Sequence, residues 1–220
     1  SLTDNTKYMN RALPVKKSFD IIERTLIIGG QNSAFYFIDG FTKDEIILKL
    51  MDSFLNISAD DMPEDATSFS TSCIPYVEVD ILGDFDSIFK NLLSGVTCLF
   101  IDGYEAAIAI DCRTYPSRSI EEPDKDKSLR GSRDGFVETI VFNTALMRRR
   151  IRDPHLIMEM YEAGTSTRTD VALCYMSDRV DRELLTTIQN KLEESKSQDL
   201  KMSQQSLAEA LFCLLYTSPS

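Results

Sequence analysis

The chain has 220 residues, 43% of them hydrophobic and 27% charged, which is the composition of an ordinary folded protein rather than of a disordered one. Its 24 basic and 35 acidic side chains give a formal net charge of −11, which argues against a general nucleic-acid binder because such proteins are usually basic. No run of about 18 apolar residues is present, and the first 17 residues are polar, so the sequence predicts neither a membrane span nor a signal peptide.

The cysteines and the histidine argue against a cofactor or a metal. The five cysteines form no C-x-x-C pair and are odd in number, which favours a reduced compartment. With a single histidine, His155, a conventional zinc site is not expected. We therefore predict no cofactor and no metal ligand.

The first half of the chain is predicted to form one α/β lobe. Residues 1–18 lack apolar periodicity and are expected to be a flexible N-terminal tail, and residues 19–115 form the lobe, in which residues 56–74 are expected to be a long loop. Its predicted elements, in chain order, are strands at Thr25–Ile28 and Ala34–Ile38, a helix opened by the capping box Thr42 to Glu45, a strand at Tyr76–Ile81, a short helix after Asp84, and strands at Val96–Ile101 and Ala106–Ile110.

A polar, proline-containing linker at residues 116–133 is predicted to join this lobe to a second one at residues 134–200. The lobe-linking turn residues are Pro116, Glu121, Glu122, Pro123, Gly131 and Gly135. The second lobe is predicted to hold a helix that ends at Asp153-Pro154, strands at Leu156–Tyr161 and Val171–Met176, and a helix from about Asp181. The predicted class is α/β, two small lobes with mixed sheets flanked by helices.

A basic segment crosses the acidic chain. Residues 113–152 carry 10 basic and 6 acidic side chains, and their arginines include Arg113, Arg118, Arg130, Arg133, Arg148, Arg149 and Arg150. Guanidinium groups bind carboxylates and phosphates through two parallel hydrogen bonds, so contacts with a partner protein, with a neighbouring subunit or with nucleic acid are all open. The alternative is that cations at a helix C-terminus complement its dipole. Because successive helical residues are about 100° apart, the last three arginines cannot all face one ligand.

The acidic residues and glycines near strand ends indicate turns rather than catalysis. Asp39, Asp102 and Asp111 sit at strand ends, and an Asp-Gly pair is first of all a turn-forming dipeptide. No G-x-S-x-G motif is present, and residues 130–135 form neither a P-loop nor a G-x-G-x-x-G motif. The sequence therefore predicts no catalytic residue and no enzyme activity.

Several ordered segments resemble the GerA family of spore germination proteins. They are Asp111–Pro123, Leu129–Thr139, Asn143–Arg152 and Thr169–Met176, and the similarity extends from about residue 18 to 211. Two shorter segments, Phe37–Glu45 and Gly131–Gly135, are more similar to the stage V sporulation AF-type branch than to the A subunits of nutrient receptors.

The resemblance implies the N-terminal soluble domain of a membrane protein. Family members carry such an α/β domain ahead of a helical bundle in the spore inner membrane, on the spore-core side, and assemble with copies of themselves and with B and C receptor subunits. It implies a role in subunit assembly and in coupling a germinant signal to ion release. From the net charge of −11, no nucleic acid is expected as a partner. The alternative is a small-ligand sensor that binds a germinant in the cleft between the lobes.

The membrane helices implied by the family are not in this chain. Because the chain also begins without methionine, we expect it to be part of a longer protein. Residues 201–220 are expected to hold a C-terminal helix and a truncated or artefactual tail, since the sequence after Cys213 does not resemble the family. In this reading the arginines of the basic segment pair with acidic surface on a neighbouring protomer or lobe.

Overall fold

The computed structural model describes residues 1–42, 44–74, 78–113 and 136–196. Contacts within the chain divide it into two compact units, unit 1 (Ser1–Pro154) and unit 2 (His155–Ser220). Both units combine helices and strands, which confirms the predicted α/β class. Each unit is described by itself below.

Unit 1 is built on a five-stranded sheet with the order β1-β2-β4-β5-β3. In that order the strands are β1 (Ile21–Ile28), β2 (Gln31–Ile38), β4 (Thr97–Ile101), β5 (Ala107–Ile110) and β3 (Val79–Leu82). Every pairing in it is antiparallel, where mixed sheets were expected. For two of the four pairings the reason is local, because β1 and β2, like β4 and β5, follow each other through short turns, and such a turn can only reverse the chain.

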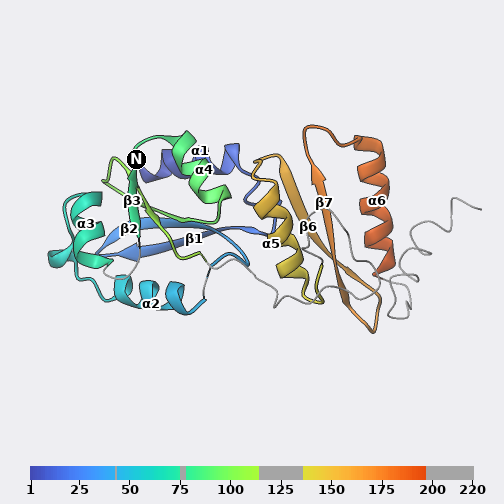
Figure 1. Ribbon diagram of the computed structural model, residues 1–220, viewed down its shortest axis with the longest axis horizontal. Helices are drawn as coiled ribbons and strands as arrows, with labels where there is room; N and C mark the ends of the chain where they lie inside the picture. The colour runs from blue at the N-terminus through green and yellow to red at the C-terminus, as the bar shows by residue number, and fades with distance from the viewer. Residues whose placement is uncertain (43, 75–77, 114–135, 197–220) are drawn as a thin grey trace, which may run out of the picture. The chain divides into compact units, whose positions relative to one another are not determined.

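Helices cover both faces of this sheet. On one face lie α1 (Leu2–Ala12) and α4 (Phe85–Leu93), and on the other α2 (Asp44–Leu55) and α3 (Ala66–Cys73), as Figure 1 shows. A short 3₁₀ helix, η1 (Ala59–Asp61), joins α2 to α3. The last helix of unit 1 is α5 (Ile140–Arg150). The unit is therefore a three-layer α/β/α structure.

The central strands supply the two cores alternately. In β2, Ala34 and Tyr36 enter the core beneath α1 and α4, while Phe35 enters the core beneath α2 and α3. In β4, Phe100 enters the core beneath α1 and α4, and Leu99 enters the core beneath α2 and α3. Because both faces are covered, these strands carry nearly continuous apolar runs, which explains why the sequence marked them clearly.

The N-terminal segment differs from the expected flexible tail, because residues 2–12 form α1. Ser1 caps the helix by accepting a hydrogen bond from the backbone N–H of Asp4. Met9 and Leu13 are 0% and 1% exposed, and both belong to the core beneath α1. These two buried residues, spaced i and i+4, mark the apolar face of the helix. Two positions are too few to show the helical periodicity of apolar residues, so the sequence did not predict a helix here.

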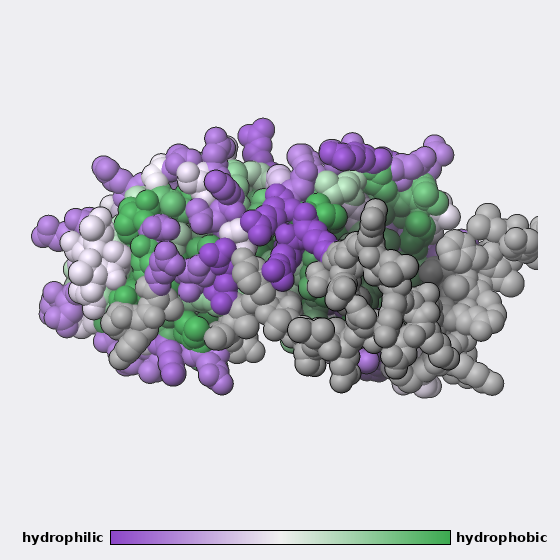
Figure 2. Space-filling view, in the orientation of Figure 1, coloured by the Kyte–Doolittle hydropathy of each residue, from purple (hydrophilic) through white to green (hydrophobic). Residues whose placement is uncertain are grey.

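The expected long loop at residues 56–74 also contains a helix, α3. Asp65 caps it by accepting from the backbone N–H of Ser68 at 2.7 Å, and Phe69 is completely buried. The other side chains of α3 are mostly Ser and Thr, which colour its surface nearly white in Figure 2. A single large apolar residue in a serine-rich segment resembles a loop in sequence, whereas contact with the sheet selects a helix.

The capping box predicted before α2 is not formed in the structure. The hydroxyl of Thr42 is buried and has no hydrogen-bond partner. Thr42 instead forms an isolated antiparallel bridge with Arg113, the residue that follows β5 by three positions. The backbone contact therefore holds Thr42 in place of the capping geometry.

Unit 2 consists of a β-hairpin and one helix in its described residues. Strands β6 (Leu156–Ala163) and β7 (Thr169–Met176) pair antiparallel, and α6 (Arg182–Ser195) is capped by Asp181. Ile157, Tyr175 and Leu185 form the core of this unit. These elements confirm the strands and the helix that the sequence predicted.

The division between the units lies at Pro154, whereas the sequence placed a linker at residues 116–133. Those linker residues lie outside the described residues. The helix that was expected to open the second lobe, α5, belongs to unit 1 by its contacts. None of the helices in the described residues has the length and apolar character that crossing a bilayer requires.

If α1 and the residue after it belong to the core, Leu13→Ala should lower the free energy of unfolding by about 2–5 kcal/mol, because it leaves a cavity. The matched control is Leu48→Ala, which removes the same atoms from a side chain that is 65% exposed and should change stability by no more than about 0.5 kcal/mol. Urea denaturation followed by circular dichroism measures both. Equal losses in the two variants would contradict a buried N-terminal segment.

Candidate functional site

The arginines at the end of α5 separate into a buried one and two exposed ones. Arg148 is 0% exposed, whereas Arg149 and Arg150 are exposed. This confirms that the three side chains do not share one face, as the 100° step between helical residues requires. The basic run therefore does not act as a single surface.

Arg148 forms an ion pair with Asp20, which immediately precedes β1. Its Nε atom donates to Oδ2 of Asp20 at 2.7 Å, and its Nη2 atom donates to Oδ1 at 3.2 Å. The hydroxyl of Ser18 also donates to Oδ1 of Asp20. From its other side, the guanidinium donates through Nη1 to the carbonyl oxygen of Asp153 at 3.0 Å. Thus one side chain joins α5, the start of β1 and the end of unit 1.

Both members of this pair are withdrawn from water, since the Asp20 side chain is 1% exposed. Such a pair adds little net stability over an apolar pair of the same shape, but removing one member leaves an uncompensated buried charge at a cost of about 3–5 kcal/mol. The sequence predicted that Arg148 pairs with acidic surface on a neighbouring protomer or lobe. In the structure it pairs with Asp20 of residues 19–115 and has no exposed surface, so the partner is within the chain rather than on another protomer.

Close packing against a turn also holds α5. Gly40, at the Asp39-Gly40 turn after β2, has φ +79°, a conformation that strongly favours glycine. A Cβ atom on Gly40 would lie 3.0 Å from the Cβ of Ala145 and 3.2 Å from Cγ1 of Val141. The turn glycine is therefore required twice, by the backbone and by the approach of α5.

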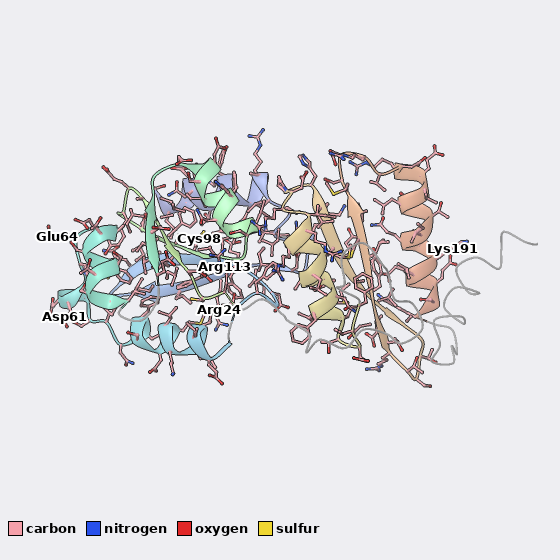
Figure 3. The ribbon with its side chains drawn as sticks, viewed as in Figure 1. Arg24, Asp61, Glu64, Cys98, Arg113 and Lys191 are labelled. Carbon is pink, nitrogen blue, oxygen red and sulfur yellow. The ribbon has the colours of Figure 1, made fainter. Side chains whose placement is uncertain are left out.

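A second arginine of the basic segment, Arg113, is also paired within the chain. Its Nε atom donates to Oδ1 of Asp111 at 2.8 Å, its Nη2 atom donates to Oδ2, and its backbone N–H donates to Oδ1 at 3.1 Å. The hydrogen bonds and the positive charge of Arg113 lower the pKa of Asp111 below its ordinary value. Figure 3 labels Arg113 within unit 1.

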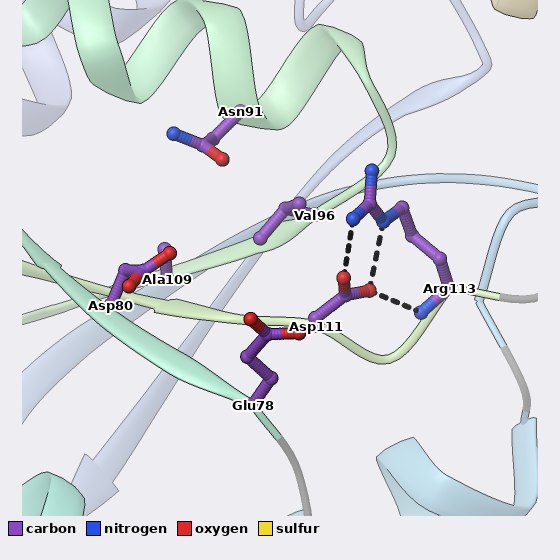
Figure 4. Close-up of a pocket in the computed structure, with 7 residues that line it drawn as sticks. All are labelled: Glu78, Asp80, Asn91, Val96, Ala109, Asp111 and Arg113. Atoms are coloured by element: carbon purple, nitrogen blue, oxygen red, sulfur yellow. Dashed lines mark hydrogen bonds and ion pairs between the residues drawn. The ribbon is translucent and has the colours of Figure 1, made fainter.

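The Arg113–Asp111 pair lies at the edge of a small polar pocket, shown in Figure 4. Glu78 precedes the edge strand β3, and Asn91 extends from α4. The complete lining is Glu78, Asp80, Asn91, Val96, Ala109, Asp111 and Arg113. With three carboxylates and one guanidinium, the lining favours a small cation over an anion. The pocket encloses about 70 Å³, well below the roughly 300–1,000 Å³ of ordinary small-molecule sites.

The other residues of the predicted interaction set and lobe-linking turn lie outside the described residues. They are Arg118, Arg130, Arg133, Pro116, Glu121, Glu122, Pro123, Gly131 and Gly135. Their predicted roles stay predictions. Of that set, the described residues are Arg113 and Arg148 to Arg150.

Sequence reasoning missed the partners of the buried groups. Asp20 lies 128 positions from Arg148, and no local pattern connects them. In unit 2, Glu159 accepts hydrogen bonds from the hydroxyls of Tyr161 and Tyr175 at 2.8 and 2.7 Å and from the amide of Gln189 at 2.7 Å. The i, i+2 spacing of Glu159 and Tyr161 on one strand face was the available signal for part of this cluster. The cluster ties β6, β7 and α6 together.

The described cysteines form no disulfide, and two of them are buried. Cys73, Cys98, Cys112 and Cys174 are free thiols. Burial raises the pKa of Cys98 to about 12 and that of Cys112 to about 11, so both thiols remain protonated near neutral pH. Cys98 lies inside unit 1 (Figure 3) and acts as a small core residue.

The architecture of the chain is that of a known receptor domain. It matches the crystal structure of the N-terminal domain of the A subunit of the Bacillus megaterium spore germinant receptor GerK3 with a TM-score of 0.66, over 90% of this chain and 72% of that chain. At 22% sequence identity, this likeness establishes a shared fold.

The chain belongs to the GerA family of Bacillus/Clostridium spore germination proteins, whose family pattern matches residues 7–213. It is 32% identical over 206 residues to stage V sporulation protein AF of Bacillus subtilis, covering 93% of this chain and 42% of that protein. It is 29% identical over 184 residues to spore germination protein KA of Bacillus subtilis, covering 82% of this chain and 34% of that protein. The resemblance predicted from the sequence is confirmed, and the chain spans less than half the length of these relatives. The family is not a known enzyme family.

Replacing Arg113 by methionine should raise the pKa of Asp111 towards its ordinary value, because the charge that lowers it is gone. The pKa of Asp111 is lower in the folded chain than in the unfolded chain. The ion pair therefore stabilises the fold at pH values above the pKa that Asp111 has in the unfolded chain. This stabilisation is lost as the pH falls through the pKa that Asp111 has in the folded chain. The Arg113→Met variant should therefore lose less stability on acidification than the original chain.

Carboxyl-carbon NMR titration of Asp111 measures this effect. Asp84 is the internal control, because its pKa is lowered by hydrogen bonds from Ser87 and owes nothing to Arg113. An unchanged Asp111 titration in the variant, or an equal change at Asp84, would show that the ion pair does not control this carboxyl.

Proposed function

We propose that this chain is the N-terminal domain of a spore germination membrane protein, where it assembles subunits and couples a germinant signal to ion release across the spore inner membrane. The observation that carries the proposal is the match, over 90% of the chain, to the N-terminal domain of a germinant receptor A subunit, together with family membership. The domain acts through protein contacts rather than through catalysis.

The chemistry of the described residues supports an interaction role. The pocket in unit 1 is small, and the two buried thiols have raised pKa values, so these groups are poorly suited to bind or attack a substrate. Arg149 and Arg150 lie at the surface at the end of α5. Exposed guanidinium groups on a chain of net charge −11 favour contact with the acidic surface of another copy.

The proposed partners are other copies of this protein and the B and C receptor subunits, with no nucleic acid. In this proposal the domain lies on the spore-core side of the inner membrane and is anchored by helices outside this chain. The free thiols of the described cysteines are compatible with a reducing core. The net negative charge supports the proposed absence of a nucleic-acid partner.

Reversing charge in the basic segment, by Arg133→Glu together with Arg149→Glu in the full-length protein, should slow germination several-fold. Like charges brought together across an interface cost several kcal/mol, whereas reversal at the exposed Arg149 should change the stability of the fold little. Germination is measured by the fall in optical density of spores after germinant is added, and folding by circular dichroism of the purified domain.

The control is Arg179→Glu, because Arg179 has a side chain that is 74% exposed and lies outside the basic segment. That variant should germinate at the original rate. Normal germination of the doubly reversed spores, with the protein present at its usual level, would remove the assembly role of these arginines.

The alternative function, small-ligand sensing, is tested by calorimetry of the purified chain. Titration with amino acids, sugars and nucleosides should give no saturable heat, because the proposed role uses protein contacts. Saturable binding would favour the sensor instead. Repeating the titration with Asp80→Asn would then show whether the ligand occupies the polar pocket of unit 1 or another place.

A further inference from the structure

The contacts of α5 with the rest of unit 1 include those of a buried charged side chain. The buried residues of this helix are Thr144, Ala145 and Arg148. The hydroxyl of Thr144 bonds to carbonyl oxygens of its own helix, those of Ile140 and Val141. Among the three, the side chains that reach other parts of unit 1 are therefore the methyl group of Ala145, which joins the core beneath α1, and the guanidinium of Arg148.

We propose that the Asp20–Arg148 pair is a latch that switches α5 between a docked and a released state. A guanidinium–carboxylate fork is strong at hydrogen-bond distance and weakens steeply when its geometry is lost. The contact of α5 with Gly40 also depends steeply on geometry, because Ala145 fits there only against a residue without a side chain. Docking is therefore close to all-or-none, as a two-state element requires.

Released from the rest of unit 1, α5 is expected to fray, because Thr139 makes no side-chain cap hydrogen bond and an isolated helix of 11 residues is marginal in water. At the start, the Asn143 side chain accepts from the backbone N–H of Val137 and donates to the Val137 carbonyl, both at 2.7 Å. At the end, the backbone N–H of Ile151 donates to the carbonyl of Met147 at 2.9 Å. These local contacts do not keep the backbone hydrogen bonds of the helix closed, so the amides of a released α5 become open to exchange.

The latch also controls the last residues of unit 1. Arg148 holds the carbonyl of Asp153, and the chain passes into unit 2 two residues later, at His155. Breaking the pair with Asp20 therefore loosens α5 and the segment 151–154 together. Arg148 is a positioning residue through which a change in unit 1 is passed to the chain leading into unit 2. The docking and release of α5 do not depend on the proposed function. Only a role of this latch in germination signalling rests on that proposal.

Hydrogen–deuterium exchange of the purified chain tests the latch. In Asp20→Asn and in Arg148→Met, amides of residues 140–154 should exchange at least about tenfold faster, while those of β4 should change by less than about twofold, because local opening does not require global unfolding. The double variant should exchange no faster at residues 140–154 than the faster single variant, since the two side chains form one contact.

Two further variants separate a latch from general destabilisation. Asp111→Asn breaks the other arginine–carboxylate fork of unit 1, and it should leave exchange at residues 140–154 unchanged. If Arg148→Met does not fold, Arg148→Lys, which keeps the charge and loses the fork, gives the same comparison with a smaller local effect.

Exchange that rises equally in β4 and in residues 140–154, or that stays unchanged in 140–154, overturns the latch. So does a double variant in which the effects of the two single changes multiply. These outcomes are independent of the germination phenotype of the charge-reversed spores, so failure of the latch and failure of the proposed function are distinguishable.

Discussion

A buried guanidinium requires hydrogen-bond acceptors inside the protein, and Arg148 donates to the carboxylate of Asp20 and to the carbonyl oxygen of Asp153. This requirement fixes the end of α5 against the residue that precedes β1. The start of β1 and the end of α5 are consequently joined by one set of polar contacts, while the turn at Gly40 meets α5 through close apolar packing. The arrangement is sensitive to its single charges because each member of a buried pair depends on the other.

This constraint changes the meaning of the basic segment. In the sequence the arginines form a belt of positive charge across an acidic chain, and a belt suggests a surface for a partner. In the structure, Arg148 is used in the interior and Arg113 is held by Asp111, whereas Arg149 and Arg150 lie at the surface. Among the described arginines, the exposed part of this segment is therefore smaller than its net charge implies, and Arg113 and Arg148 make contacts within unit 1.

The family relationship and the structure point to different aspects of the same domain. The family match and the relatives named for spore germination and sporulation place the chain in the GerA family, and the likeness to a germinant receptor domain shows a shared fold. The described residues add the physical content: a three-layer unit that ends with α5, and a smaller hairpin-and-helix unit. Within the first unit, the buried Arg148 of α5 pairs with Asp20.

The sequence by itself determined the class of fold, most strands, the helices after Asp84 and Asp181, and the family. The strands and helices depend on local signals: apolar alternation, capping side chains and turn glycines, which act over a few residues. The family was identified by the resemblance of longer ordered segments. Only the tertiary structure decided that residues 2–12 and 66–73 are helical, that Arg148 is internal and that Asp20 is its partner. Each of these depends on burial against residues that are distant in the chain, and no local pattern records which distant group will supply the contact.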